Sequence, residues 1–116
     1  MKKKFVKLDH DKIDFTMLDF EFLKGVSEVL MFGEKKYTRG NWMNADLEDG
    51  IFRYKKAAIR HLLAYALDGE LMDPETNMYH LDHLACCVMF ARYFEEKKRK
   101  VISKPIKMEA SDEAKG

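Results

Sequence analysis

The residue types with the greatest capacity for chemistry lie close together, in the segment from Glu70 to His83. Glu70 and Asp73 are three positions apart, so on a helix their carboxylates would lie on one face. Two carboxylates in this arrangement attract a hard divalent cation. Because Gly69 and Pro74 flank the pair, a loop is the alternative interpretation, in which Asp73 only caps the next helix.

Two histidines follow in the same segment. His80 and His83 would point to the same side of a helix, where two imidazoles can bind a metal ion or face a phosphate. A purely structural histidine pair is the alternative, but the nearby carboxylates, including Glu75, favour a metal site. This mixture of oxygen and nitrogen donors suits manganese, iron or zinc as well as magnesium. We therefore predict a magnesium or manganese site with the ligands Glu70, Asp73, His80 and His83.

The segment Glu34–Trp42 carries side chains that commonly bind nucleotides. Lysines neutralise phosphate charge, asparagine can hydrogen-bond a base edge, and an aromatic ring can stack on a base. The candidates for substrate binding in this segment are Lys35, Lys36, Tyr37, Asn41 and Trp42. Trp42 is the only tryptophan in the chain, and the alternative interpretation is that it fills the edge of the core.

Arg60 and His61 are further candidate substrate-binding residues. Arg60 follows the apolar residue Ile59 at the edge of an apolar helical stripe, where a guanidinium group could hold a phosphate through two hydrogen bonds. An ordinary surface arginine is the alternative. The sequence has no glycine-rich phosphate loop, Walker motif or serine nucleophile elbow.

Three segments with apolar residues at helical spacing must position these groups. The first predicted helix covers about 17–32 and stops at Gly33. The second covers about 50–68, with Gly69 as its C-cap. The third begins at Asp73-Pro74 and runs to about residue 98.

These helices predict an all-α fold, a small bundle of three to four helices in a single domain at 1–98. The remaining residues, 99–116, are predicted to form a flexible polar tail. Strand patterns are absent apart from the weak candidate Phe5–Leu8. Because the apolar stripes are broad, we expect self-association into a homo-oligomer to complete the bundle.

The composition excludes several classes of protein. The chain has 116 residues, a net charge of +1 and 47% hydrophobic residues, which is typical of one globular domain and not of a dedicated nucleic-acid binder. No apolar run is long enough to span a membrane. The two cysteines are adjacent, so they cannot easily bridge, and a reducing cytoplasm is the expected setting.

The ordered set of motifs resembles a known family. Six segments carry the resemblance: 32–37, Asn41-Trp42, 60–64, Gly69-Glu70, 73–75 and 80–85. Together they resemble the phage dATP/dGTP diphosphohydrolase N-terminal domain family, grouped with the all-α, MazG-like nucleoside triphosphate pyrophosphohydrolases. The resemblance covers about residues 18–96 and implies cleavage of purine deoxynucleoside triphosphates to monophosphate and pyrophosphate. If the chain is phage-encoded, we expect it in the host cytoplasm.

The resemblance also implies how metal would be held. MazG-like enzymes hold magnesium with ExxE and ExxD pairs, and Glu70-x-x-Asp73 matches the second pair in form. The first helix has no ExxE pair, because Glu28 and Glu34 are six positions apart, and histidines are not typical ligands in that group.

The leading hypothesis is therefore a metal-dependent nucleotide pyrophosphohydrolase in which Glu34 or Glu75 orients the attacking water. The alternative is a non-catalytic phage protein on the same scaffold that binds and sequesters a nucleotide signal. A third hypothesis is a helical homo-oligomer that has no ligand.

Overall fold

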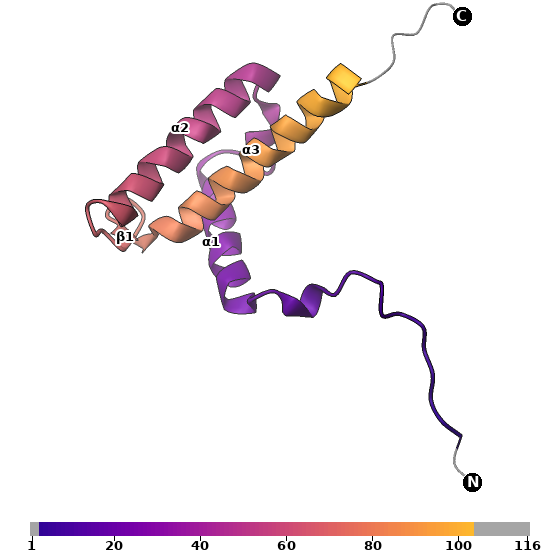
Figure 1. Cartoon of the computed structure of the whole chain (residues 1–116). Coiled ribbons are helices and arrows are strands. Elements are labelled where there is room, and N and C mark those ends of the chain that lie inside the picture. Colours follow the sequence, from indigo (N-terminus) through magenta and orange to yellow (C-terminus); the bar gives the residue numbers. More distant parts are fainter. Residues whose placement is uncertain (1–2, 104–116) are drawn as a thin grey trace, which may run out of the picture.

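Two long antiparallel helices lie side by side, and a third helix crosses them on one side (Figure 1). The structure is a computed structural model that describes residues 3–103. Its elements are η1 (Phe15–Met17), α1 (Phe20–Lys36), η2 (Asn41–Asn44), α2 (Leu47–Ala66), β1 (Met72–Asp73), β2 (Met78–Tyr79) and α3 (His80–Ser103). The predicted fold class, a small helical domain, is confirmed. No helix within residues 3–103 is long and apolar enough to cross a membrane.

Helix α1 starts and ends later than its apolar pattern indicated. It begins after Asp19, whose side chain accepts a hydrogen bond from the Glu21 N–H at 3.2 Å. The predicted stop at Gly33 is wrong, because this glycine stays helical and its carbonyl accepts the Tyr37 N–H at 2.9 Å. Lysines in the last turn suit the negative end of a helix, which favours this continuation to Lys36.

A small hairpin replaces the predicted start of the third helix. The Asp73 carboxylate accepts the Glu75 N–H at 2.9 Å, and Asn77 adopts a left-handed φ of 58°, so the chain turns back at residues 74–77 instead of coiling. Asp73 then pairs with Met78 across the two strands. Helix α3 therefore begins only at His80 and continues to Ser103, past the expected end. The segment Phe5–Leu8 forms no strand.

Helix α2 ends at Ala66 with Leu67 as its C-cap, so the predicted end at residue 68 and the predicted C-cap at Gly69 lie slightly too late. Gly69 has a φ of 67°, and the next N–H bonds back to the Ala64 carbonyl at 3.0 Å. Of the predicted tail, residues 99–103 belong to α3 and 104–116 lie outside the described residues.

The core lies between α2 and α3. Phe94 is fully buried, and it packs so closely on Gly50 that a Cβ there would lie 3.0 Å from the ring. Cys86 and Cys87 are also buried and unpaired, and burial raises the pKa of the Cys86 thiol to about 12 and that of Cys87 to about 11. Both cysteines therefore act as small apolar side chains.

Helix α1 has no buried residue, and it is in tight contact with α3 at Gly25. The Asp82 carboxylate of α3 lies against this glycine, at a place where any side chain would overlap it. Burial raises the pKa of the Asp82 carboxyl group, while the neighbouring His83 opposes this effect and Glu28 adds to it. The position of α1 thus depends on a glycine at this contact.

We expect Gly25→Ala to reduce the free energy of unfolding by about 1–3 kcal/mol, as overpacking commonly does. The added Cβ would overlap Asp82 and lie 2.8 Å from its Cγ, so α1 or the carboxylate must move. Urea unfolding followed by circular dichroism measures the change. Gly33→Ala is the matched control, because a Cβ there meets nothing within 4 Å. Equal stability of the two variants would contradict this account.

Candidate functional site

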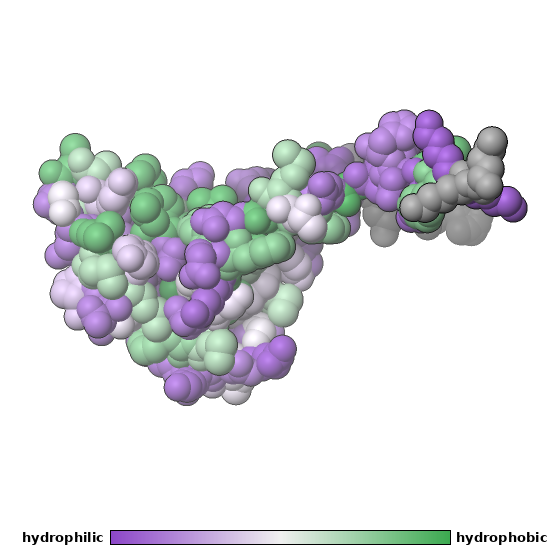
Figure 2. All heavy atoms as spheres, turned by 90° about the horizontal axis from the view of Figure 1, so that it is seen from below, coloured by the Kyte–Doolittle hydropathy of each residue, from purple (hydrophilic) through white to green (hydrophobic). Residues whose placement is uncertain are grey.

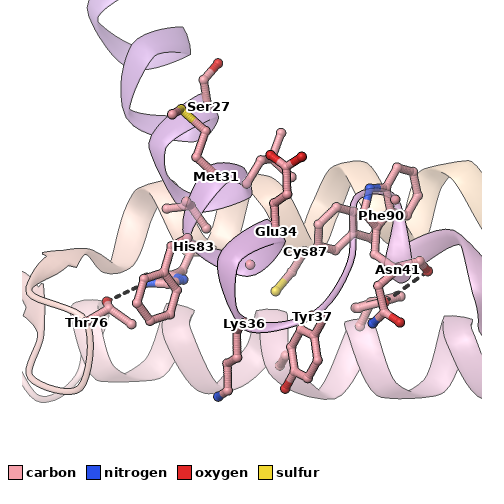
Figure 3. A pocket seen from close by; sticks show the side chains of 18 of the residues that line it. Ser27, Met31, Glu34, Lys36, Tyr37, Asn41, Thr76, His83, Cys87 and Phe90 are labelled. Atoms are coloured by element: carbon pink, nitrogen blue, oxygen red, sulfur yellow. Dashed lines mark hydrogen bonds between the residues drawn. The ribbon is translucent and has the colours of Figure 1, made fainter.

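One cavity of about 690 Å³ lies where α1, the following loop, α2, the hairpin and α3 meet. Figure 3 shows His83 and Thr76 at one end and Asn41 and Phe90 at the other, with α1 and its loop between them. Ten of the candidate residues line this cavity: Glu34, Lys36, Tyr37, Asn41, Trp42, Arg60, His61, Asp73, Glu75 and His83. The structure therefore brings the two polar segments of the sequence together in one place.

Three side chains at one end of this cavity are close enough to share a metal ion. One ligand atom from each of His61, Asp73 and His83 lies within 4.8 Å of the others, and we refer to these residues as the His–Asp–His cluster. His61 and Asp73 are 5% and 6% exposed. The two imidazole rings are parallel, with their centroids 4.7 Å apart. His61 comes from α2, Asp73 from β1 and His83 from the first turn of α3.

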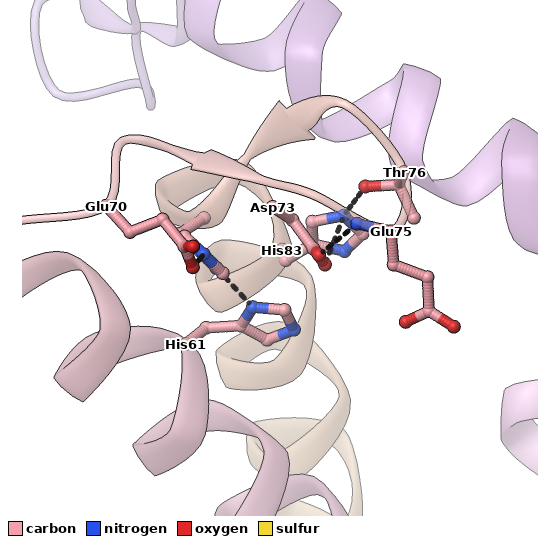
Figure 4. A network of polar contacts seen from close by, with 7 residues as sticks. His61, Glu70, Asp73, Glu75, Thr76 and His83 are labelled. Carbon is pink, nitrogen blue, oxygen red and sulfur yellow. Dashed lines mark hydrogen bonds and ion pairs between the residues drawn. The ribbon is translucent and has the colours of Figure 1, made fainter. Parts of the chain in front are cut away.

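A chain of hydrogen bonds leads into the cluster from outside the cavity. Glu70 Oε1 lies 2.7 Å from His80 Nε2, and His80 Nδ1 lies 2.8 Å from His61 Nδ1 (Figure 4). A carboxylate only accepts hydrogen bonds, so His80 Nε2 donates, and in a neutral ring its Nδ1 must accept from His61. The Nε2 of His61 then carries a free lone pair. Glu70 and His80, expected as ligands, thus lie outside the cluster and are hydrogen-bonded to its His61.

The protonation of the cluster favours ligation. Burial lowers the pKa of His61 to about 4, and the neighbouring His83 adds to this effect. Burial also lowers the pKa of His83, although Asp73 opposes it. Both imidazoles are therefore neutral near pH 7 and can act as metal ligands or accept protons.

Thr76 of the hairpin is hydrogen-bonded to His83, and Asp73 lies beside the same ring nitrogen. His83 Nε2 lies 2.7 Å from the Thr76 hydroxyl oxygen and 3.6 Å from Asp73 Oδ2 (Figure 4). The other Asp73 oxygen is occupied by the Glu75 N–H. Thr76 was not among the predicted residues, because nothing in the sequence shows that the turn folds over α3.

The cavity wall formed by α1 and its loop is more exposed. Lys36 and Arg60 both line it and supply positive charge within reach of an anion. Glu34, at the same wall, forms an ion pair with Arg39 at 3.2 Å. Lys35 does not line the cavity, which leaves Lys36 as the lysine facing it.

Trp42 packs into an aromatic group and also lines the cavity. Its ring centroid lies 4.5 Å from Phe90 and 4.9 Å from Tyr93, and its carbonyl accepts a hydrogen bond from Tyr54 at 3.1 Å. Trp42 therefore packs against the core edge, as the alternative interpretation expected, and it also borders the cavity, where its contact with a base stays a prediction. Tyr54 and Phe90, which also line this end, were missed because their helical spacing marks them only as apolar positions.

Comparison with known proteins gives one family. A family model described as dATP/dGTP diphosphohydrolase, N-terminal, matches residues 2–104. No curated protein and no solved structure matches the chain. The match spans every residue that lines the cavity.

Proposed function

The chain belongs to the dATP/dGTP diphosphohydrolase N-terminal domain family, and we propose that it hydrolyses purine deoxynucleoside triphosphates to monophosphate and pyrophosphate with a bound divalent metal ion. One observation carries this proposal. A single cavity contains the His–Asp–His cluster at one end and cationic and aromatic side chains along its wall. Such an arrangement suits a ligand with phosphates at one end and a base at the other.

The donor set of the cluster fits a divalent ion. Two neutral imidazoles and one carboxylate suit manganese better than magnesium, which prefers oxygen ligands. His61, Asp73 and His83 would hold the ion, and it would supply Lewis-acid polarisation of phosphate oxygens. This assignment changes the ligand set expected from the sequence: His61 joins it, while Glu70 and His80 support it through hydrogen bonds.

The chain's own residues would bind the rest of the substrate. Lys36 and Arg60 stabilise the negative charge that develops on the leaving phosphates. Trp42, at the far end of the cavity, contacts the base. Two carboxylates are proposed to orient water. Glu34 forms an ion pair with Arg39, and the Glu75 carboxylate points away from the cluster (Figure 4). Either one must change rotamer to act.

The test is incubation of the full chain with each deoxynucleoside triphosphate, with manganese or magnesium, followed by chromatography of the products. We expect monophosphate and pyrophosphate, formed faster with manganese and from purine substrates. Release of single phosphate, or no metal requirement, would overturn the proposal.

A non-catalytic nucleotide-binding role is the second candidate, and one observation favours it. The cluster contains a single carboxylate, so it offers fewer acidic groups than two-metal hydrolases use. In that case the same incubation leaves the nucleotide intact, while thermal unfolding shows that the nucleotide stabilises the protein.

The hydrogen bonds that join Glu70 to His80 and His80 to His61 lead to a further prediction. We expect Glu70→Ala to weaken manganese binding roughly ten- to hundredfold, as loss of a group that orients a metal-binding histidine commonly does. Without the carboxylate, His80 can place its proton on Nδ1, which forces the proton of His61 onto Nε2. Competition with a fluorescent chelator measures the affinity.

Glu70→Gln is the matched control, because its carbonyl oxygen can still accept the His80 N–H. We expect it to weaken binding less than Glu70→Ala does. If both variants bind manganese as the wild type does, the chain of hydrogen bonds has no part in the site.

A further inference from the structure

A second, smaller pocket of about 250 Å³ lies between the first half of α1 and the hairpin, and it shares no lining residue with the cavity of the His–Asp–His cluster. Its carboxylates are Glu21 and Glu28 of α1 and Asp82 of α3, and we refer to it as the acidic pocket. Its other lining residues include Met72, Met78 and Tyr79. It therefore combines negative charge with apolar walls.

Asp82 is the informative residue of this pocket. It is only 8% exposed, and no lysine, arginine or histidine within residues 3–103 forms an ion pair with it. No described side chain hydrogen-bonds to its carboxylate, although Lys24 shares the pocket lining. Because a buried carboxylate without a cation or hydrogen-bond donor is costly, the pocket is suited to a positively charged group.

The same chain carries a segment with the complementary properties. Residues 3–14, the N-terminal arm, contain no helix or strand and run away from the helices (Figure 1). Within it, Lys3, Lys4 and Lys7 surround Phe5, which is 86% exposed. The end of the arm is therefore basic and apolar. It complements the acidic pocket, which combines negative charge with apolar walls.

We propose that the N-terminal arm of a second copy of this chain binds the acidic pocket, with an arm lysine beside Asp82 and Phe5 on the apolar rim. Each copy gives one arm and receives one, which makes a closed two-fold dimer.

The geometry favours the arm of a second copy over the chain's own arm. Asp14 accepts the Thr16 N–H at 3.0 Å and so caps η1, directly before α1 begins. The first half of α1 lines the acidic pocket. From the capped turn, the arm runs away from α1 (Figure 1). To reach the acidic pocket of the same copy, the arm would therefore have to reverse its direction at the capped turn of η1.

The exposed apolar area is sufficient for a dimer. Exposed apolar side chains continue from the arm into α1, and they include Ile13, Phe15, Met17, Phe20 and Phe22. Figure 2 shows apolar side chains among polar ones on the helical body and near the base of the segment that extends from it. Since a buried aromatic contributes about 150–250 Å², a few of them approach the ~800 Å² per partner of a standard interface.

A charge exchange between two variants tests this proposal. The arm variant replaces Lys3, Lys4 and Lys7 with glutamate, and the pocket variant replaces Glu21 and Glu28 with lysine. All five side chains are exposed, so we expect both variants to fold. We expect wild type to sediment as a dimer at micromolar concentration, and each variant alone as a monomer of about 13.7 kDa. Mixed in equal amounts, the two variants should form a heterodimer, since both of its arm contacts then join opposite charges.

The control for the arm variant carries the same change in net charge at distant exposed positions, Lys55→Glu, Lys97→Glu and Lys100→Glu, and it should remain dimeric. A monomeric wild type, or variants that dimerise alone as tightly as wild type, would overturn the proposal. So would a mixture that stays monomeric.

Cross-linking of wild-type protein gives an independent readout. A carbodiimide joins a lysine to a carboxylate without a spacer, and a mixture of 14N- and 15N-labelled copies identifies links between chains. We expect mixed-isotope links from Lys3, Lys4 or Lys7 to Glu21 or Glu28. Links found only within one chain would show that the arm folds onto its own pocket. Both readouts measure assembly, so they are independent of nucleotide hydrolysis.

Discussion

Replacing Asp73 with asparagine is expected to weaken manganese binding by at least about 100-fold, the upper end of what loss of a supporting group around a metal costs. Asp73 is the only carboxylate in the His–Asp–His cluster, so the substitution removes its negative charge. The asparagine oxygen can still accept the Glu75 N–H, which preserves the hairpin turn. Isothermal titration with manganese measures the affinity, and nucleotide hydrolysis should fall with it.

Glu75→Gln is the matched control for this substitution. It removes one carboxylate from the cavity wall, two residues away, but not from the cluster. We expect its manganese affinity to stay near that of wild type, even if its turnover falls. If Asp73→Asn binds manganese as tightly as wild type, while its unfolding curve is unchanged, the metal lies elsewhere.

Replacing Trp42 with alanine should weaken nucleotide binding by roughly ten- to hundredfold, because stacking on a base contributes about 1–3 kcal/mol. The structure adds a second effect. Trp42 is half-buried against Phe90 and Tyr93, so stability should also fall, by less than the about 3–5 kcal/mol of a fully buried tryptophan. Affinity for a non-hydrolysable analogue must therefore be measured below the unfolding transition of the variant.

Two comparisons separate these effects. Manganese affinity should be nearly unchanged in Trp42→Ala, since the cluster lies at the other end of the cavity. Trp42→Phe keeps an aromatic ring and should recover most of both losses. A folded Trp42→Ala protein with wild-type nucleotide affinity would show that the tryptophan serves only the core.

The sequence indicated the helices well and the hairpin poorly. Apolar spacing and Gly69 located α2 within a few residues, because both signals are local. Asp73-Pro74 was ambiguous, since an aspartate before a proline can cap a helix or a turn. The left-handed φ of Asn77 and the pairing of Asp73 with Met78 show that the chain forms a turn here.

The sequence indicated which residues lie together better than it indicated how they contact one another. His61 was placed with the substrate because Arg60 precedes it, and no spacing rule links it to a hairpin that begins beyond α2. Conversely, Glu70 and His80 were grouped with Asp73 because they are close in sequence. Only the fold shows that the Glu70 and His80 side chains point to each other.

The hairpin between α2 and α3 also bears on the order in which the molecule folds. All three cluster residues belong to the continuous segment from His61 to His83, so the contacts that join them close short loops and cost little chain entropy. Contacts of low sequence separation form fast. Helix α1, in contrast, meets α3 at Gly25 and Asp82, far apart in the chain. We therefore expect α2, the hairpin and α3 to assemble first, and a metal ion to be captured before α1 closes the cavity.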